Sequence, residues 1–221
     1  MLLQAENVTK EYRRLGNGTN RLIAVQPCSL TLEPGTVTVI MGRSGSGKST
    51  LLQMLSGLLS PTQGQVLADG KALYAMKDGD LSAFRGQHFG VIPQGRSAFS
   101  SLTVAENILL PGYMAGKQPD PAAAEELMER FGILSLKNEL PKSLSGGELR
   151  RMAVIRALLY RPEVLFADEP TGDLDDENTQ LVLTLLKEAA ANGAAVLLVT
   201  HEDAAASFAD RMLRMNSGVL G

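Results

Sequence analysis

Residues 36–50 read Thr36-Val-Thr-Val-Ile-Met41-Gly42-Arg-Ser-Gly-Ser-Gly-Lys48-Ser49-Thr50, and this stretch decides the fold of the chain. Its first six residues are β-branched and almost wholly apolar, which is typical of a buried strand. A glycine-rich run interrupts the strand, and apolar residues return with helical spacing over Ser49 to Leu59. The stretch therefore predicts a strand, a glycine-rich loop and a helix in immediate succession.

The glycine-rich loop fits the pattern G-x-x-x-x-G-K-[ST] at every fixed position. Glycines let backbone N–H groups turn toward a phosphate, and the positive end of the following helix faces the anion. We expect Lys48 to reach the β- and γ-phosphates of ATP, and Ser49 to offer its hydroxyl to Mg²⁺. An ordinary glycine-rich turn would not require this strand and helix around it. The residues predicted to bind nucleotide here are Gly42, Arg43, Ser44, Gly45, Ser46, Gly47, Lys48, Ser49 and Thr50.

A second motif, Val164-Leu-Phe-Ala-Asp168-Glu169, is an apolar strand that ends in two adjacent carboxylates. Open α/β sheets bind their ligands at the carboxyl ends of their strands. We expect Asp168 to hold the Mg²⁺ shell and Glu169 to accept a proton from the attacking water. The alternative is a pair of solvated turn acids, and the phosphate loop favours the catalytic interpretation.

A third motif, Leu144-Ser145-Gly146-Gly147-Glu148, precedes a helical pattern that runs to Tyr160. Ser145 and the two glycines would form a helix N-terminus with unpaired N–H groups, which is a second place for an anion. Read alone, the same residues predict a plain N-cap.

The composition is that of an ordinary globular chain, with 44% hydrophobic and 20% charged residues among 221. Its net charge of −3 gives no electrostatic footprint for nucleic acid. No stretch approaches the roughly 20 apolar residues of a membrane-spanning helix, and the N-terminal stretch does not predict a secretory signal. The single cysteine, Cys28, predicts a buried inert thiol.

Strands alternate with helices, which predicts an α/β fold with a mostly parallel core sheet covered on both faces. Two short strands, Leu2 to Val8 and Leu30 to Leu32, predict an antiparallel front edge with a turn at Gly16-Asn17-Gly18. From about Leu81 to Tyr160 the pattern is mainly helical. The other predicted elements are strands at Gln65 to Ala68, Val164 to Ala167 and Val196 to Thr200, and helices from Pro121, over Gly147 to Tyr160 and over Asn178 to Ala191.

With the three motifs together, the chain resembles the ATP-binding subunit of an ABC transporter along its whole length. This resemblance implies one P-loop NTPase domain over residues 1–221, with a catalytic core and antiparallel β-subdomain (1–84 and 161–221) and an inserted α-helical subdomain (85–160). In that family LSGGE is the signature motif, and it closes on the nucleotide held by the other subunit. The resemblance implies a homodimer in the ATP-bound state, ATP hydrolysis with Mg²⁺, and an integral membrane permease that holds the chain on the cytoplasmic face of the membrane.

Four further positions match the family's pattern. Tyr12 lies where an aromatic stacks on adenine, and Gln94 where a glutamine touches Mg²⁺ and the attacking water. Asp175, in Thr171-Gly-Asp-Leu-Asp175, matches an aspartate carried across the dimer interface, and His201 matches a histidine that contacts the γ-phosphate. From the residues alone, Tyr12 could be a half-buried tyrosine, Asp175 an N-cap and His201 a structural histidine. The implied catalytic set is Lys48, Gln94, Glu169 and His201, and the implied metal set is Ser49, Gln94 and Asp168.

The chain departs from the family's usual pattern at three places. Arg43 follows the first loop glycine, where small residues are common. Pro93 precedes Gln94, where an aromatic is common. Leu149-Arg150-Arg151 replaces the glutamine-rich run that usually follows the signature, which leaves the interface chemistry there open.

Within the family, Glu106-Asn-Ile-Leu-Leu-Pro111 and the Gly-Asp-Leu-Asp loop resemble the branch for lipoprotein release and for macrolide or antimicrobial-peptide export. A non-transport ATPase in DNA repair, chromosome organisation or translation is the alternative. It would need long heptad insertions, a second ATP module or a basic stripe, and the chain shows none of these. A small-molecule kinase is opposed by the signature motif.

Overall fold

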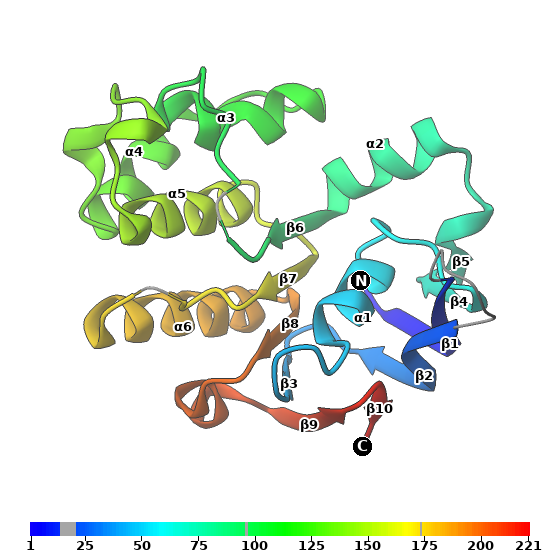
Figure 1. The fold of residues 1–221 in the computed structure, drawn as a ribbon. Coiled ribbons are helices and arrows are strands. Elements are labelled where there is room, and N and C mark those ends of the chain that lie inside the picture. Colours follow the sequence, from blue (N-terminus) through cyan, green and yellow to red (C-terminus); the bar gives the residue numbers. More distant parts are fainter. Residues whose placement is uncertain (14–20, 96, 173) are drawn as a thin grey trace.

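The computed structural model describes residues 1–13, 21–95, 97–172 and 174–221. Its described strands form two sheets (Figure 1). The antiparallel sheet, in the order β2-β1-β4-β5, consists of β1 (Leu3–Arg13), β2 (Arg21–Leu32), β4 (Gln63–Ala68) and β5 (Lys71–Ala72). The core sheet, in the order β10-β9-β3-β8-β7-β6, consists of β3 (Val37–Met41), β6 (Phe89–Ile92), β7 (Val164–Asp168), β8 (Ala195–Thr200), β9 (Arg211–Asn216) and β10 (Val219–Leu220). The core sheet is parallel apart from β10 against β9, so the predicted fold class is confirmed.

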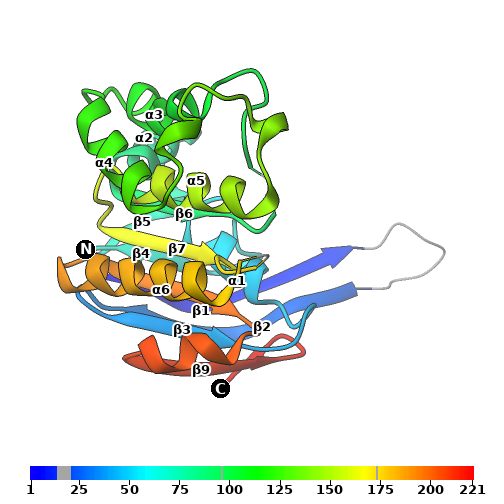
Figure 2. The same cartoon turned by 90° about the vertical axis from the view of Figure 1, so that its left-hand side faces the viewer.

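The helices cover both faces of the core sheet, and three of them gather in a separate lobe (Figures 1 and 2). Their bounds are α1 Lys48–Leu55, α2 Asp78–His88, α3 Val104–Met114, α4 Pro121–Arg130, α5 Gly146–Leu158 and α6 Asp176–Ala191. Short 3-10 helices span Leu73–Ala75, Leu134–Leu136, Pro141–Ser143 and Asp203–Phe208. Helix α1 contacts both sheets, α6 packs on the opposite face of the core sheet, and α3, α4 and α5 pack on one another. Among the described residues, no helix has the length and apolar character needed to cross a bilayer.

Alternate residues of β7 enter two different hydrophobic cores. Leu165 and Ala167 pack with residues of α5 and α6, whereas Val164 and Phe166 pack with residues of α1. Successive side chains of a strand point to opposite faces, so a strand covered on both sides must be apolar throughout. This two-sided burial explains the continuous apolar runs by which the central strands are recognised in the sequence.

The antiparallel strands are longer than the two short predicted ones, Leu2 to Val8 and Leu30 to Leu32. The register of β1 against β2 shifts between Ala5 and Glu11, and such irregularities disrupt the polar and apolar alternation that marks a strand. The predicted turn at Gly16-Asn17-Gly18 lies outside the described residues. Cys28, in β2, is half-buried, and burial raises the pKa of its thiol.

Three strands of the core sheet were not predicted. Strand β6 lies in the segment expected to be mainly helical, yet Phe89 to Ile92 pair with Val164 to Ala167 of β7. Strands β9 and β10 are at the other edge of the sheet, and most of their side chains are exposed or half-buried. Because β6 is bonded to the core sheet, we propose that the helical subdomain begins after Ile92 instead of at residue 85.

The loop between β6 and α3 is held in place by one buried side chain. Asn107 of α3 is fully buried. Its Nδ2 donates hydrogen bonds to the carbonyls of Phe99, Leu102 and Thr103 at 2.9–3.0 Å, and its Oδ1 accepts one from the amide of Phe99 at 2.8 Å. The side-chain amide of Asn107 thus holds residues 99–103, which follow Gln94 in the chain.

Replacing Asn107 with alanine should lower the free energy of unfolding by about 1–3 kcal/mol, because partly buried carbonyls of the loop lose a donor and the Phe99 amide loses its acceptor. Urea unfolding of the two proteins measures this difference. Asn192→Ala is the matched control, since among the described residues that exposed side-chain amide donates only to the Glu188 carbonyl. Its cost should stay below about 0.5 kcal/mol. Equal losses in the two variants would contradict the assigned role of Asn107.

Candidate nucleotide site

The loop between β3 and α1 is pressed against backbone on two sides. A Cβ atom on Gly42 would lie 2.3 Å from the carbonyl oxygen of Met215 in β9. A Cβ atom on Gly47 would lie 2.3 Å from the carbonyl oxygen of Ala24 in β2. Gly45 and Gly47 also have φ angles of 78° and 105°, which side chains disfavour. The glycines of the motif are therefore required by the path of the loop itself.

Lys48, the first residue of α1, is buried beside this loop. Its Nζ donates hydrogen bonds to the carbonyls of Gly42 at 2.7 Å and Arg43 at 3.2 Å. The same Nζ lies 3.8 Å from Oε1 of Glu169 at the end of β7. The charge is thus held between the phosphate loop and the carboxylate, within reach of an anion bound in the loop.

Ser49 and Asp168 meet although they are 119 residues apart, because α1 starts beside the end of β7. The Ser49 hydroxyl donates a hydrogen bond of 3.0 Å to Oδ1 of Asp168. Burial raises the pKa of the Asp168 carboxyl, and the bond from Ser49 opposes that rise. A hydroxyl and a carboxylate are oxygen ligands of the type that Mg²⁺ takes, together with nucleotide phosphates.

Among the described residues, no group of three or more His, Cys, Asp and Glu side chains could hold a metal ion. Mg²⁺ commonly has only one or two carboxylate ligands from the protein and completes its shell with water and phosphate oxygens. The pair of Ser49 and Asp168 fits that pattern, and a site made only of protein carboxylates is not formed.

Glu169 lies where β7 ends, next to the end of β8. It is buried and has a φ angle of 49°, a backbone conformation that non-glycine residues seldom adopt. Its Oε2 accepts a hydrogen bond of 3.4 Å from Thr200 and lies 2.8 Å from Nδ1 of His201. The structure therefore brings the predicted base and the predicted histidine together, with Lys48 on the other side of the carboxylate.

A cavity of about 520 Å³ opens over the phosphate loop. Gln94 and Glu169 line it together with loop and helix residues, so Gln94 reaches the site from the segment after β6. The wall also contains residues that sequence reasoning missed, namely Leu22, Ile23, Ala24, Ser217 and Gly218. They come from β2 and from the turn between β9 and β10, and only the fold places them beside the loop. The predicted residues that line the cavity are Ser44, Gly45, Gly47, Lys48, Ser49, Thr50, Gln94 and Glu169.

Other predicted nucleotide residues lie at the margin of this cavity. Tyr12 of β1 is 39% exposed. It pairs with Leu22 of β2, which lines the cavity. Gly42, Arg43 and His201 line a neighbouring cavity of about 430 Å³. Ser46 is buried in the loop, and its Oγ has no hydrogen-bond partner among the described residues. Contact between nucleotide and Tyr12 stays a prediction.

Ser145, Gly146, Gly147 and Asp175 do not line the cavity of their own chain. Ser145 begins α5 with a capping box, in which its Oγ accepts from the amide of Glu148 and its amide donates to the Glu148 carboxylate. Those bonds lower the pKa of the Glu148 carboxyl. Asp175 caps α6, and its Oδ1 accepts from the amide of Asn178 at 2.8 Å. The N-cap interpretation is therefore confirmed for both motifs, and contact of these residues with nucleotide stays a prediction.

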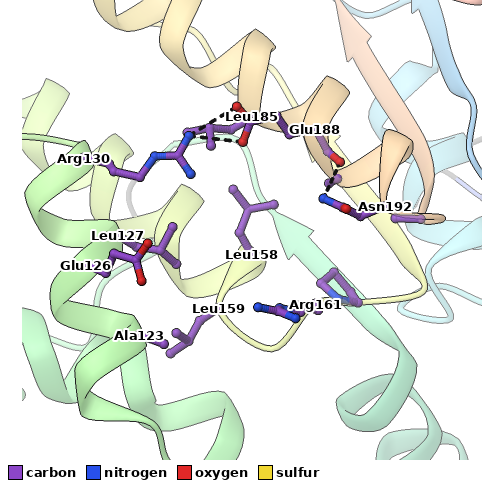
Figure 3. A pocket seen from close by; sticks show the side chains of 13 residues that line it. Ala123, Glu126, Leu127, Arg130, Leu158, Leu159, Arg161, Leu185, Glu188 and Asn192 are labelled. Atoms are coloured by element: carbon purple, nitrogen blue, oxygen red, sulfur yellow. Dashed lines mark hydrogen bonds and ion pairs between the residues drawn. The ribbon is translucent and has the colours of Figure 1, made fainter.

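A separate cavity of about 470 Å³ lies between α4, the end of α5 and α6 (Figure 3). Leu158 and Leu185 form part of its wall, and Arg130 and Glu188 pair across it at 3.1 Å. None of the predicted site residues lines it. The chemistry is therefore concentrated at the phosphate loop.

A phosphate loop between a strand and a helix, with two carboxylates at the end of a parallel strand of the same sheet, one strand removed, defines a P-loop nucleoside triphosphatase. The family model described as ABC transporter matches residues 25–172, and the chain belongs to that family. It is an ATP-binding ATPase of this family, which confirms the resemblance found in the sequence.

Two relatives and one solved structure illustrate the likeness. The lipoprotein-releasing system ATP-binding protein LolD of Shewanella frigidimarina is 37% identical and covers 99% of this chain and 92% of its own length. The macrolide export ATP-binding/permease protein MacB of Mannheimia succiniciproducens is 37% identical over 95% of this chain, which spans about a third (33%) of that protein. The ATP-binding cassette MJ0796, solved as a dimer in a post-hydrolysis state with ADP and Pi, has a TM-score of 0.90 and 30% identity, and covers 98% of this chain and 95% of its own.

Gly47→Ala should destabilise the nucleotide-free protein more than Gly45→Ala. Both positions have positive φ, which costs a side chain about 1–2 kcal/mol. Only at Gly47 must the backbone of β2 also move, and such overpacking adds about 1–3 kcal/mol. Denaturant unfolding of the two variants gives the difference, and equal stabilities would refute the close packing of Gly47 on Ala24.

Proposed function

We propose that this chain is the motor subunit of a transporter, in which two copies enclose two ATP molecules and drive a separate membrane permease. The carrying observation is the position of the signature residues. The signature residues form a capped helix N-terminus, yet they do not line the cavity above the phosphate loop of their own chain. The dimeric state of MJ0796 supports completion of the site by a second subunit.

Hydrolysis in this site depends on positioning and charge more than on covalent chemistry. We propose that Ser49, Asp168 and Gln94 hold Mg²⁺, which would neutralise charge on the phosphates when it is bound. Glu169 accepts the proton of the attacking water. His201 and Thr200 hold one carboxylate oxygen of Glu169, and Lys48 faces the other. The backbone amides of the phosphate loop bind the nucleotide tail.

Movement of the permease would follow from the difference in ATP affinity between the open and closed dimers. Because LolD is named for lipoprotein release and MacB for macrolide export, we propose that the cargo leaves the cytoplasm or the membrane. The chain would then lie on the cytoplasmic face of the membrane and be held there by its permease.

Glu169→Gln should keep ATP binding and abolish turnover, because the amide cannot take the proton from water. Loss of a general base lowers kcat by about 10²–10⁴-fold. Phosphate release and size-exclusion chromatography with Mg·ATP should show slow turnover and a trapped dimer. Glu188→Gln, which removes an exposed charge paired with Arg130, should change neither result. Unchanged phosphate release in Glu169→Gln would remove Glu169 from its role.

Detergent extraction of native membranes followed by a pull-down on this chain should recover an integral membrane protein. The amount recovered should depend on the nucleotide, because the closed and open dimers present different surfaces to the permease. Lys48→Ala, which should bind nucleotide weakly, is the control for that dependence. Recovery of ribosomes or nucleic acid without a membrane protein would favour the non-transport alternative.

A further inference from the structure

Arg150 is a buried arginine on α5, the helix that begins with the signature residues. Its side chain is only 7% exposed. It belongs to Leu149-Arg150-Arg151, the run that replaces the usual glutamines of the family. A buried guanidinium is costly unless its donors find acceptors and opposite charges. Its contacts should therefore show what the arginine does at this position.

The guanidinium of Arg150 lies between two segments of the nucleotide site. Its Nη1 donates a hydrogen bond of 2.9 Å to the carbonyl of Pro93, the residue before Gln94. A Cβ atom built on Gly172 would lie 3.9 Å from Nη2 of Arg150. The guanidinium therefore also adjoins the loop that leads to Asp175. The positive charge lowers the pKa of the Asp168 carboxyl, against the larger effect of burial.

Helix α5 holds the Gln94 segment at a second point. Arg156, six residues after Arg150, donates from Nη1 to the carbonyl of Ser97 at 2.8 Å and from Nη2 to the Ser97 hydroxyl at 2.6 Å. Gln94 therefore lies between two backbone positions that are both bonded to the same helix. Its own side chain lines the cavity over the phosphate loop.

We propose that Arg150 is a positioning residue for ATP hydrolysis, which fixes Gln94 relative to the signature end of α5. A charged donor makes a stronger hydrogen bond than a neutral one, and its strength increases in a dry environment. The planar guanidinium also spans two neighbouring segments in one fixed geometry. The glutamine that is usual in the family would supply neither the charge nor this reach.

This inference rests on the proposed dimer and specifies how its two sites communicate. The signature end of α5 would contact the ATP of the second subunit, whereas Gln94 faces the ATP of its own subunit. A helix is stiff over the few turns between Ser145 and Arg156. When the signature closes on one nucleotide, Arg150 would carry that movement to the Gln94 beside the other nucleotide.

The test compares Arg150→Met with Arg85→Met in the full chain. Arg85 is the matched control, because its Nη1 also donates at 2.9 Å to a loop carbonyl, that of Gly57, away from the cavity. Arg150→Met should lower kcat about tenfold, the value of one charged hydrogen bond. Its affinity for ATP should stay within about twofold, and its cooperativity in ATP should fall. Arg85→Met should change the melting temperature but not kcat.

Two further variants separate positioning from general damage. Arg150→Lys keeps one charged donor and should restore at least about a third of the lost rate. In a Gln94→Ala background, Arg150→Met should cost less than about twofold in kcat, because a residue that acts through Gln94 has nothing left to position. If Arg150→Met does not fold, Arg150→Gln replaces it in the same comparison.

A full tenfold loss in the Gln94→Ala background would overturn the proposal, as would an unchanged kcat in Arg150→Met. The proposed function fails by a different result. In that result the unsubstituted chain hydrolyses ATP, but the Glu169→Gln variant does not form a dimer with Mg·ATP. In that case the dependence of Arg150 on Gln94 can still be measured in a single subunit. The two failures are therefore distinguishable.

Discussion

The close packing of the phosphate loop against two carbonyl groups is the constraint on which the rest of the site depends. Gly42 lies against Met215 of β9, and Gly47 lies against Ala24 of β2, at distances that leave no room for a Cβ atom. The loop can then turn its amides toward a phosphate, because its outer side is fixed by β9 of the core sheet and β2 of the antiparallel sheet. The antiparallel sheet and the C-terminal strands are thus part of the nucleotide site, although they contribute few polar side chains to it.

The second determinant is the parallel order of β7 and β8, whose carboxyl ends are neighbours. This order places Asp168 and Glu169 beside Thr200 and His201, and it places all four beside the start of α1. Buried carboxylates are costly, and here Ser49 and Lys48 offset part of that cost through their contacts with Asp168 and Glu169. The same hydroxyl, ammonium and carboxylate groups are those that we propose to bind a magnesium nucleotide, so the site is preorganised for a charged ligand.

The sequence predicted the parts of this molecule that have strong local signals. The loop from Gly42 to Thr50, the apolar runs of β7 and β8 and the N-caps at Ser145 and Asp175 all follow from short patterns. Strand β6 was missed because an edge strand of four residues has too little periodicity to distinguish it from its helical neighbours. Leu22 to Ala24 and the turn at Ser217 and Gly218 were missed because only long-range packing places them at the cavity. The family resemblance predicted which residues share one site. The contacts of Arg150 could be identified only from the three-dimensional structure.

The capping box of α5 is compatible with both interpretations of the signature motif. In α5, the Ser145 hydroxyl accepts from the amide of Glu148, the third residue of the helix. The amides of Gly146 and Gly147 belong to the first turn, where a helix provides no internal acceptor. The cap therefore stabilises the helix in a single chain and leaves two amides and the positive helix end available for an anion. Under the proposed function, one residue would serve folding in its own subunit and nucleotide binding in the next, so the two interpretations do not compete.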